Sequence, residues 1–191
     1  MSAPTLPTTI NFVGEINDKT TSLLFFLLTE QVRSGARKIR INLASNGGIV
    51  AHAISIFNFL IGLKDVHIHT HNLGKIDSGA NLIFLAGKKR TASKVCSFLF
   101  HPPKMILQGQ GFAQLDIEEI QEHLDTLKHD EQKMAEIIGM RIGKKPSEII
   151  NLFKERKTFS SEESKKLGLV TDIEDFVAAP GTPIFSITNQ A

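Results

Sequence analysis

The apolar residues of this chain recur in turn with the spacing of a strand and with the spacing of a helix, and this alternation constrains the fold more than any single motif. The strand-like segments are 10–13, 38–43, 66–71 and 95–100, and the helix-like segments between them are 18–34, 49–63 and 78–86. Strands joined through helices run parallel, because a helical crossover returns the chain to the same end of the sheet. We therefore predict an α/β fold with a mostly parallel sheet.

A long polar helix is predicted next, over residues 114–141. Its apolar residues recur at spacings of three, four and seven and form one narrow stripe: Ile117, Ile120, Leu124, Leu127, Met134 and Ile138. Such a stripe has to be covered, either by the helix's own domain or by another subunit. Two shorter helices are predicted over 146–153 and 160–167, the second opening with the capping-box sequence SSEE. Residues 177–191, with two prolines and no strong period, are predicted to form a loose tail.

The composition bounds the class of protein. A chain of 191 residues that is 41% hydrophobic suits a single domain, and we expect one over 1–191 with its core at about 10–175. The net charge is only +2 and the basic residues are scattered, which argues against a nucleic-acid partner. Cys96 is the only cysteine, so an internal disulfide is impossible. Because MSAPTLPTTI is too polar for a signal peptide and no apolar stretch reaches roughly 18 residues, we expect a cytoplasmic protein with no membrane span.

Two glycine-bearing turns and one histidine stand at the ends of predicted strands. Gly47 and Gly48 follow a strand and precede a helix, where bare N–H groups can bind an anion or simply allow the chain to reverse. Ser78 occupies a second strand-to-helix junction, either as a nucleophile or as the helix cap. His101 ends the next strand. Because ligands gather at the carboxyl edge of parallel sheets, we expect these residues to form one site.

Four segments carry a resemblance to a known family. They are ASNGGIVAHAISIF, GKIDSGANLIFLAG, FLFHPP and FSSEESKKLGLVTDI, and their order and approximate spacing over about residues 10–175 resemble the Clp protease proteolytic subunit family of serine peptidases. The resemblance implies a spiral α/β fold related to the crotonases, in which a long protruding handle helix joins two rings face to face. It also implies hydrolysis of peptides or unfolded proteins inside the resulting chamber, by a homo-oligomeric ring or double ring that needs no cofactor.

The resemblance assigns roles to individual residues. Ser78 matches the nucleophile and His101 the general base, while Gly48 and Gly79 match the backbone donors of the oxyanion hole. The family's aspartate falls on one of the basic residues at 156 and 157. Glu155 is the nearest carboxylate and becomes the third catalytic residue if the loop shifts its register.

The chain differs from the family pattern at the position of the catalytic aspartate, and this difference leaves alternatives to an active peptidase open. The basic residues at the aspartate position favour a non-catalytic ring subunit with the same handle. A crotonase-like acyl-CoA enzyme is a further alternative, although a serine followed by a strand-end His-Pro favours the peptidase. Only MSAPTLPTT precedes Ile10, where the family has a looped segment that contacts its ATPase, so we expect no dependence on a Clp ATPase.

The sequence HIHTH at 67–71 places His67, His69 and His71 on one face of a strand, where three imidazoles can bind zinc. No cysteine or carboxylate cluster nearby supplies an evident fourth ligand. We therefore predict no metal site and assign the three histidines to a polar strand face or to a subunit contact.

Overall fold

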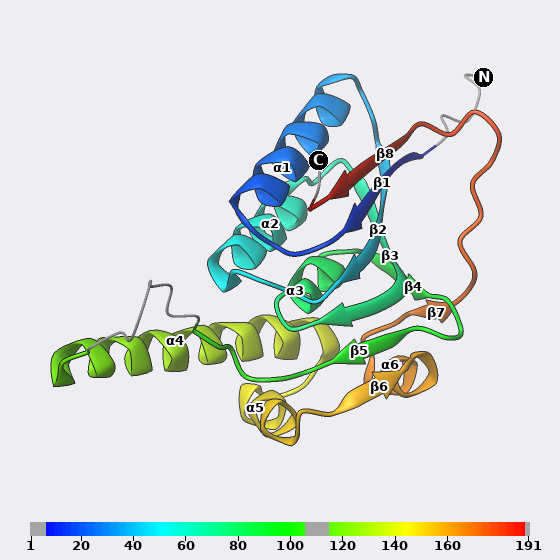
Figure 1. Cartoon of the computed structure of the whole chain (residues 1–191). Coiled ribbons are helices and arrows are strands. Elements are labelled where there is room, and N and C mark those ends of the chain that lie inside the picture. The colour runs from blue at the N-terminus through cyan, green and yellow to red at the C-terminus, as the bar shows by residue number, and fades with distance from the viewer. Residues whose placement is uncertain (1–6, 106–114, 190–191) are drawn as a thin grey trace.

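The computed structural model describes residues 7–105 and 115–189 (Figure 1). Its strands are β1 (Thr8–Val13), β2 (Lys38–Ser45), β3 (His67–Asp77), β4 (Lys89–Ala92), β5 (Ser97–Leu99), β6 (Thr158–Ser160), β7 (Asp172–Ile173) and β8 (Ile184–Thr188). Its helices are α1 (Asp18–Arg33), α2 (Val50–Gly62), α3 (Ala80–Leu85), α4 (Ile117–Ile142), α5 (Pro146–Glu155) and α6 (Ser161–Leu167). None of the helices in these two ranges combines the length and the hydrophobicity of a membrane-spanning segment.

The described strands form one eight-stranded sheet in the order β6-β5-β3-β2-β1-β8, and β4 pairs with both β3 and β7. Every pair in this sheet is parallel except β5 with β6. The predicted α/β fold with a mostly parallel sheet is therefore confirmed.

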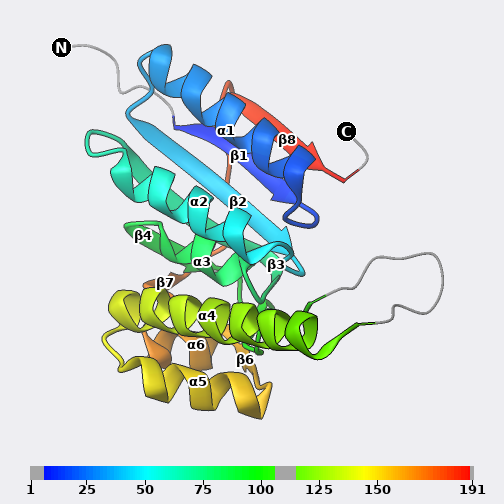
Figure 2. The ribbon, with the colours of Figure 1, turned by 90° about the vertical axis from the view of Figure 1, so that its left-hand side faces the viewer.

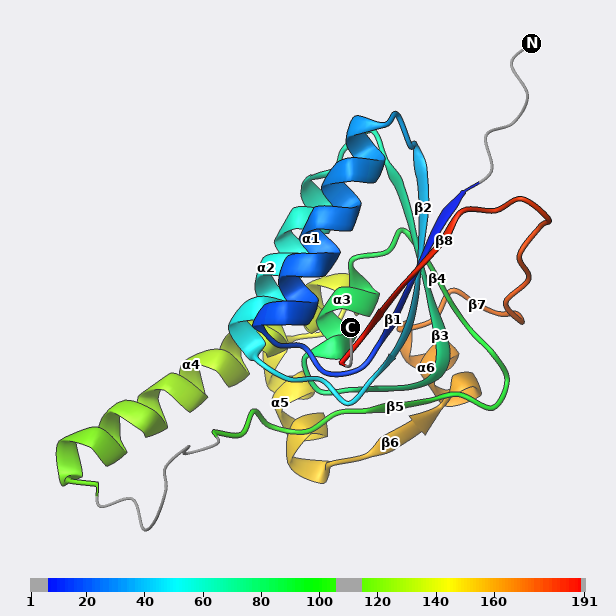
Figure 3. The same cartoon turned by 45° about the horizontal axis from the view of Figure 1, so that its top comes forward.

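The two faces of the sheet are covered differently. Helices α1, α2 and α3 lie on one face (Figure 3), where Ile39, Ile41 and Ile68 of the strands are fully or almost fully buried. The other face is crossed by the chain that leads from β7 to β8 (Figure 1). The alternation in the sequence KIRINL of β2 reflects this division, because successive side chains of a strand point to opposite faces.

The long polar helix is confirmed as α4, although it begins at Ile117 rather than at residue 114, which lies outside the described residues. Asp116 caps it, with its side chain accepting from the Glu119 N–H at 2.8 Å. The second half of α4 packs against its own domain beside α5 (Figure 2), where Met134 and Ile138 are fully buried. The first half projects away from the domain.

Two predictions about strands were wrong in extent. The tail at 177–191 was expected to be loose, but Ile184–Thr188 forms β8 and pairs in parallel with β1. The strand forms because the free edge of β1 offers it hydrogen-bond partners. The local sequence does not reveal this, because strand formation depends on the neighbouring strand more than on the β-propensity of the residues. Strand β3 was expected to end at His71, but it continues to Asp77 by pairing with β5 beyond the reach of β4.

Candidate active site

Ser78 stands in a sharp turn between β3 and α3. Its φ of 53° is in the left-handed region, which a residue with a side chain rarely adopts. The Ser78 N–H donates to the Leu99 carbonyl at 3.1 Å, and the Ser78 carbonyl accepts from the Asn81 N–H at 3.1 Å and from Asn81 Nδ2 at 3.0 Å. Helix α3 begins at Ala80 with no side-chain cap. The Ser78 hydroxyl therefore does not cap the helix, and the strained turn is of the kind that presents a nucleophile.

The Gly47–Gly48 turn packs directly against Ser78. A Cβ atom on Gly47 would lie 2.7 Å from the Ser78 Cβ atom and 2.9 Å from the Asp77 carbonyl oxygen, and one on Gly48 would overlap the Ile16 carbonyl oxygen. Both glycines have positive φ, at 91° and 150°. The turn is held by hydrogen bonds from the Ile16 N–H to the Gly47 carbonyl and from the Ile49 N–H to the Ile16 carbonyl. Only glycine fits this approach of one loop to the other.

The N–H groups of Gly48 and Gly79 donate to no acceptor among the described residues. The Gly48 carbonyl oxygen lies 3.8 Å from the position of a Cβ atom on Gly79, so the two residues are neighbours across the turns. Two unpaired donors beside a serine hydroxyl are what a developing oxyanion requires. The resemblance to the Clp subunits assigns the oxyanion-hole role to these same two residues, and that role stays a prediction.

His101 follows the carboxyl end of β5, next to the carboxyl end of β3. The parallel pairing of Asp77 with Leu99 places Ser78 and His101 just beyond the ends of these neighbouring strands. The His101 Nδ1 atom lies 2.6 Å from the Pro102 carbonyl oxygen. A carbonyl only accepts, so Nδ1 carries a proton, and in the neutral imidazole Nε2 then has the free lone pair. No hydrogen bond joins the Ser78 hydroxyl to His101 within residues 7–105; in the absence of substrate such bonds are often long.

The structure does not bring Glu155 to His101. Glu155 is the exposed last residue of α5 and makes no hydrogen bond or ion pair with His101 in the described chain. The antiparallel pairing of Leu99 with Thr158 continues as a hydrogen bond from the Phe100 N–H to the Lys157 carbonyl, at 3.3 Å. This register places Arg156 opposite His101. The segment that runs beside the end of β5 therefore carries a basic residue, the left-handed C-cap of α5, where the resemblance expects the aspartate.

Comparisons with known proteins show the family to which the chain belongs. The family model for Clp protease matches residues 6–176. The chain belongs to the Clp protease family. It is 24% identical over 161 residues to an ATP-dependent Clp protease proteolytic subunit 3 of Streptomyces avermitilis, covering 83% of this chain and 68% of the relative. It is 25% identical over 171 residues to the proteolytic subunit 1 of Streptomyces coelicolor, covering 88% of this chain and 72% of the relative.

The fold is that of Clp protease subunits. ClpP1 from Listeria monocytogenes superimposes with a TM-score of 0.74 at 19% identity, over 88% of this chain and 92% of that chain. The predicted family and the ClpP-like fold are thus confirmed. As a member of this family the chain is a ClpP-like peptidase, and its individual site residues rest on the geometry described above.

One acidic residue beside the site of this Clp family member was missed in the sequence. Asp77, immediately before Ser78, is 3% exposed. Its Oδ2 atom lies 2.6 Å from Lys75 Nζ, and its buried Oδ1 atom has no hydrogen-bond partner within the described chain. Asp77 pairs in register with Leu99, two residues before His101. The sequence feature that could have identified Asp77 is its charge, because it stands directly before Ser78 at the end of a predicted buried segment.

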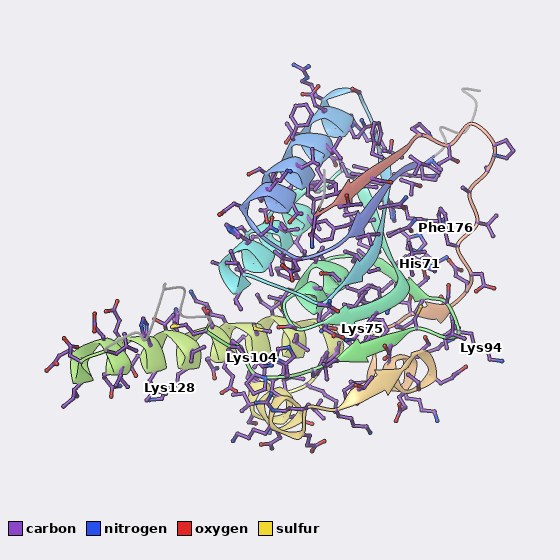
Figure 4. The ribbon with its side chains drawn as sticks, in the orientation of Figure 1. His71, Lys75, Lys94, Lys104, Lys128 and Phe176 are labelled. Atoms are coloured by element: carbon purple, nitrogen blue, oxygen red, sulfur yellow. The ribbon has the colours of Figure 1, made fainter. Side chains whose placement is uncertain are left out.

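The HIHTH segment forms a hydrogen-bonded network on the sheet face away from the helices. The Arg40 Nε–H donates to His69 Nδ1 at 3.2 Å, and Thr91 Oγ1 lies 2.8 Å from His69 Nε2 and 2.7 Å from His71 Nδ1. Figure 4 shows His71 beside Phe176, with ring centroids 6.1 Å apart. The described residues contain no group of three or more histidine, cysteine or acidic side chains placed to bind a metal ion.

Proposed function

We propose that this chain is an active serine endopeptidase that cleaves peptides or unfolded proteins through an acyl-enzyme on Ser78. The observation that carries the proposal is the left-handed Ser78 beside the two unpaired N–H groups of Gly48 and Gly79. His101 Nε2 takes the hydroxyl proton as Ser78 Oγ attacks the peptide carbonyl carbon. The two N–H groups stabilise the resulting oxyanion, and each such donor contributes about 3 kcal/mol to lowering the barrier.

The tetrahedral intermediate then expels the amine, which takes its proton from His101, and leaves an ester on Ser78. A water molecule, deprotonated by His101, attacks this ester and releases the carboxylic acid and the free hydroxyl. The Pro102 carbonyl performs the part of the third residue that fixes the imidazole tautomer. A neutral carbonyl stabilises the imidazolium less than a carboxylate does, so we expect turnover to be slow.

A non-catalytic ring subunit is the second candidate, and one observation favours it. Arg156 lies opposite His101, where its positive charge opposes formation of an imidazolium. Treatment with a fluorophosphonate probe followed by mass spectrometry separates the two candidates. We expect a covalent adduct on Ser78 that is absent in Ser78→Ala. A parent protein that does not react, or a Ser78→Ala variant that labels equally, contradicts an acylable Ser78.

We also propose that copies of the chain assemble through α4 into a ring or double ring. Three stripe residues of its projecting half are exposed: Ile117 by 80%, Ile120 by 53% and Leu124 by 44%. Burying them against a second copy removes apolar surface from water at about 25 cal/mol per Å². The cytoplasmic location and independence of a Clp ATPase stay predictions from the sequence.

A further inference from the structure

Basic side chains form two rows across the amino ends of β2, β3 and β4. The register pairs Arg40 with His69 and His69 with Lys89, and it pairs Lys38 with His67 two residues earlier along the strands. Paired residues of parallel strands point to the same face, which here is the face away from the helices. These five side chains, together with Pro7, Ile39 and Ile68, line a cleft of about 280 Å³. We call it the basic cleft.

The positive charge of the basic cleft is only partly neutralised. Lys89 Nζ forms a pair with both carboxylate oxygens of Glu174, at 2.8 and 2.9 Å. Within the described residues, neither Lys38 nor Arg40 makes an ion pair with a carboxylate. Two cations on one strand at this spacing repel each other. The cleft therefore favours a ligand that supplies two negative charges.

The Arg40 guanidinium is held in place before any ligand arrives. Its Nε–H donates to His69 Nδ1 at 3.2 Å, one Nη donates to the Val177 carbonyl at 3.1 Å, and the group lies 5.4 Å from the centre of the Phe176 ring. Because His69 Nδ1 accepts this bond, its Nε2 carries the proton and donates to Thr91 Oγ1. A fixed guanidinium loses little freedom when it binds an anion.

We infer that the basic cleft binds the phosphate group of a small phosphorylated molecule. A phosphate dianion matches Lys38 and Arg40, the two cations of the cleft that form no ion pair within the described residues, and a guanidinium fork with an ammonium beside it is a common phosphate-binding pair. The volume is at the lower end for small-molecule sites, which favours a compact ligand over a long peptide. His67 and Ser78 lie at opposite ends of β3, so this ligand is distinct from the peptide substrate.

The test uses the full chain and inorganic phosphate as the probe, with sodium chloride added to keep the ionic strength constant. Calorimetric titration at pH 7.5 is expected to give saturable binding in the parent protein. Lys38→Gln should weaken phosphate binding at least tenfold, because it removes an exposed cation whose ammonium group makes no hydrogen bond or ion pair within the described residues. Arg40→Lys keeps the positive charge but removes the paired N–H donors of the guanidinium, and we expect this variant to bind phosphate at least fivefold more weakly.

Lys128→Gln is the matched control, since it removes one lysine charge from the projecting part of α4 (Figure 4) and should leave phosphate affinity unchanged. Equal weakening in Lys38→Gln and Lys128→Gln shows unspecific charge attraction and overturns the site. No saturable binding of phosphate to the parent also overturns it. A phosphoserine peptide that binds at least tenfold more tightly than phosphate overturns the small-molecule assignment. None of these outcomes depends on whether Ser78 is acylated.

Discussion

His101 Nδ1 donates its proton to the carbonyl oxygen of Pro102, 2.6 Å away, in the residue that follows it. The bond fixes the tautomer in which Nε2 is the base, so the imidazole needs no carboxylate for orientation. It supplies no full negative charge to offset the imidazolium that forms during catalysis. Loss of such a charge, together with loss of the tautomer, costs about four orders of magnitude in turnover in serine proteases. In this protein only the negative charge is lost, because the Pro102 carbonyl still fixes the tautomer.

Arg156→Asp is therefore expected to raise kcat at least tenfold. Position 156 lies opposite His101 and has φ of 51°, and Asp tolerates this left-handed conformation better than most residues. Peptide turnover under saturating substrate is the measurement. Arg156→Asn is the control, because it removes the cation and fits the same backbone without adding a carboxylate. Equal kcat values in the two variants would show that a carboxylate at this position does not act on His101.

Glu155→Gln is expected to change kcat less than twofold, because Glu155 is exposed at the end of α5. The same turnover assay measures it. A loss of an order of magnitude or more would show that the loop moves Glu155 to His101 when substrate binds.

The Gly47–Gly48 turn and the sequence around Ser78 could be predicted because each needs special residues at fixed positions. Glycine is required where φ is positive and another backbone approaches closely, and this local need is visible in the sequence. The hydrogen bond of His101 and the unpaired Oδ1 of Asp77 could not be predicted, since both depend on rotamers and on neighbouring strands. Strand β8 was missed for the same reason, because its partner β1 is about 170 residues away in the sequence.

Gly47→Ala should abolish probe labelling of Ser78 in the folded protein. The added methyl group would lie 2.7 Å from the Ser78 Cβ atom, so the serine has to move away from the oxyanion donors. Gly35→Ala is a matched control, since Gly35 has the same φ of 91° but no neighbouring atom within 4 Å. Both changes should lower the free energy of unfolding by roughly 1–2 kcal/mol through backbone strain. Equal labelling of both variants would contradict the close packing of the turn on Ser78.

Asp77→Asn should lower kcat about tenfold with little change in KM. The buried carboxylate precedes Ser78 and pairs in register with Leu99, two residues before His101, and a negative charge near the imidazole favours the imidazolium formed in the transition state. Steady-state kinetics on a peptide substrate measure the effect. Asp172→Asn removes an exposed carboxylate paired with Lys165 and serves as the control. An unchanged kcat in Asp77→Asn would assign Asp77 to the ion pair with Lys75 alone.

Ile120→Glu should dissociate the assembly formed through α4. A carboxylate placed in the exposed stripe has to be buried without a partner if two copies meet there. Thr126→Glu adds the same charge to the other side of the helix and should leave the assembly intact. Sedimentation velocity is the measurement, with the single chain expected at 21.1 kDa. A parent protein that sediments as a monomer at micromolar concentration contradicts the proposed ring.

The network of His69 and His71 should make folding stability depend on pH in the acidic range. Burial, followed by the positive charge of Arg40, lowers the pKa of each histidine from 6.5 to about 4. At pH values between about 4 and 6.5, the unfolded chain therefore binds more protons at these two histidines than the folded chain does. The stability is therefore fully present above pH 6.5 and is lost as the pH falls toward 4. From pH 6.5 to 5 this amounts to roughly 1.5 kcal/mol per histidine.

Urea unfolding at these two pH values measures the effect, and His71→Gln should remove about half of the difference between them. His67→Gln is the matched control, because His67 is exposed at the start of β3 and lies outside the hydrogen bonds of Thr91. The loss on acidification should remain in that variant. A parent protein equally stable at both pH values would show that His69 and His71 take up protons in the folded chain as readily as in the unfolded one, and would contradict the lowered pKa of both histidines.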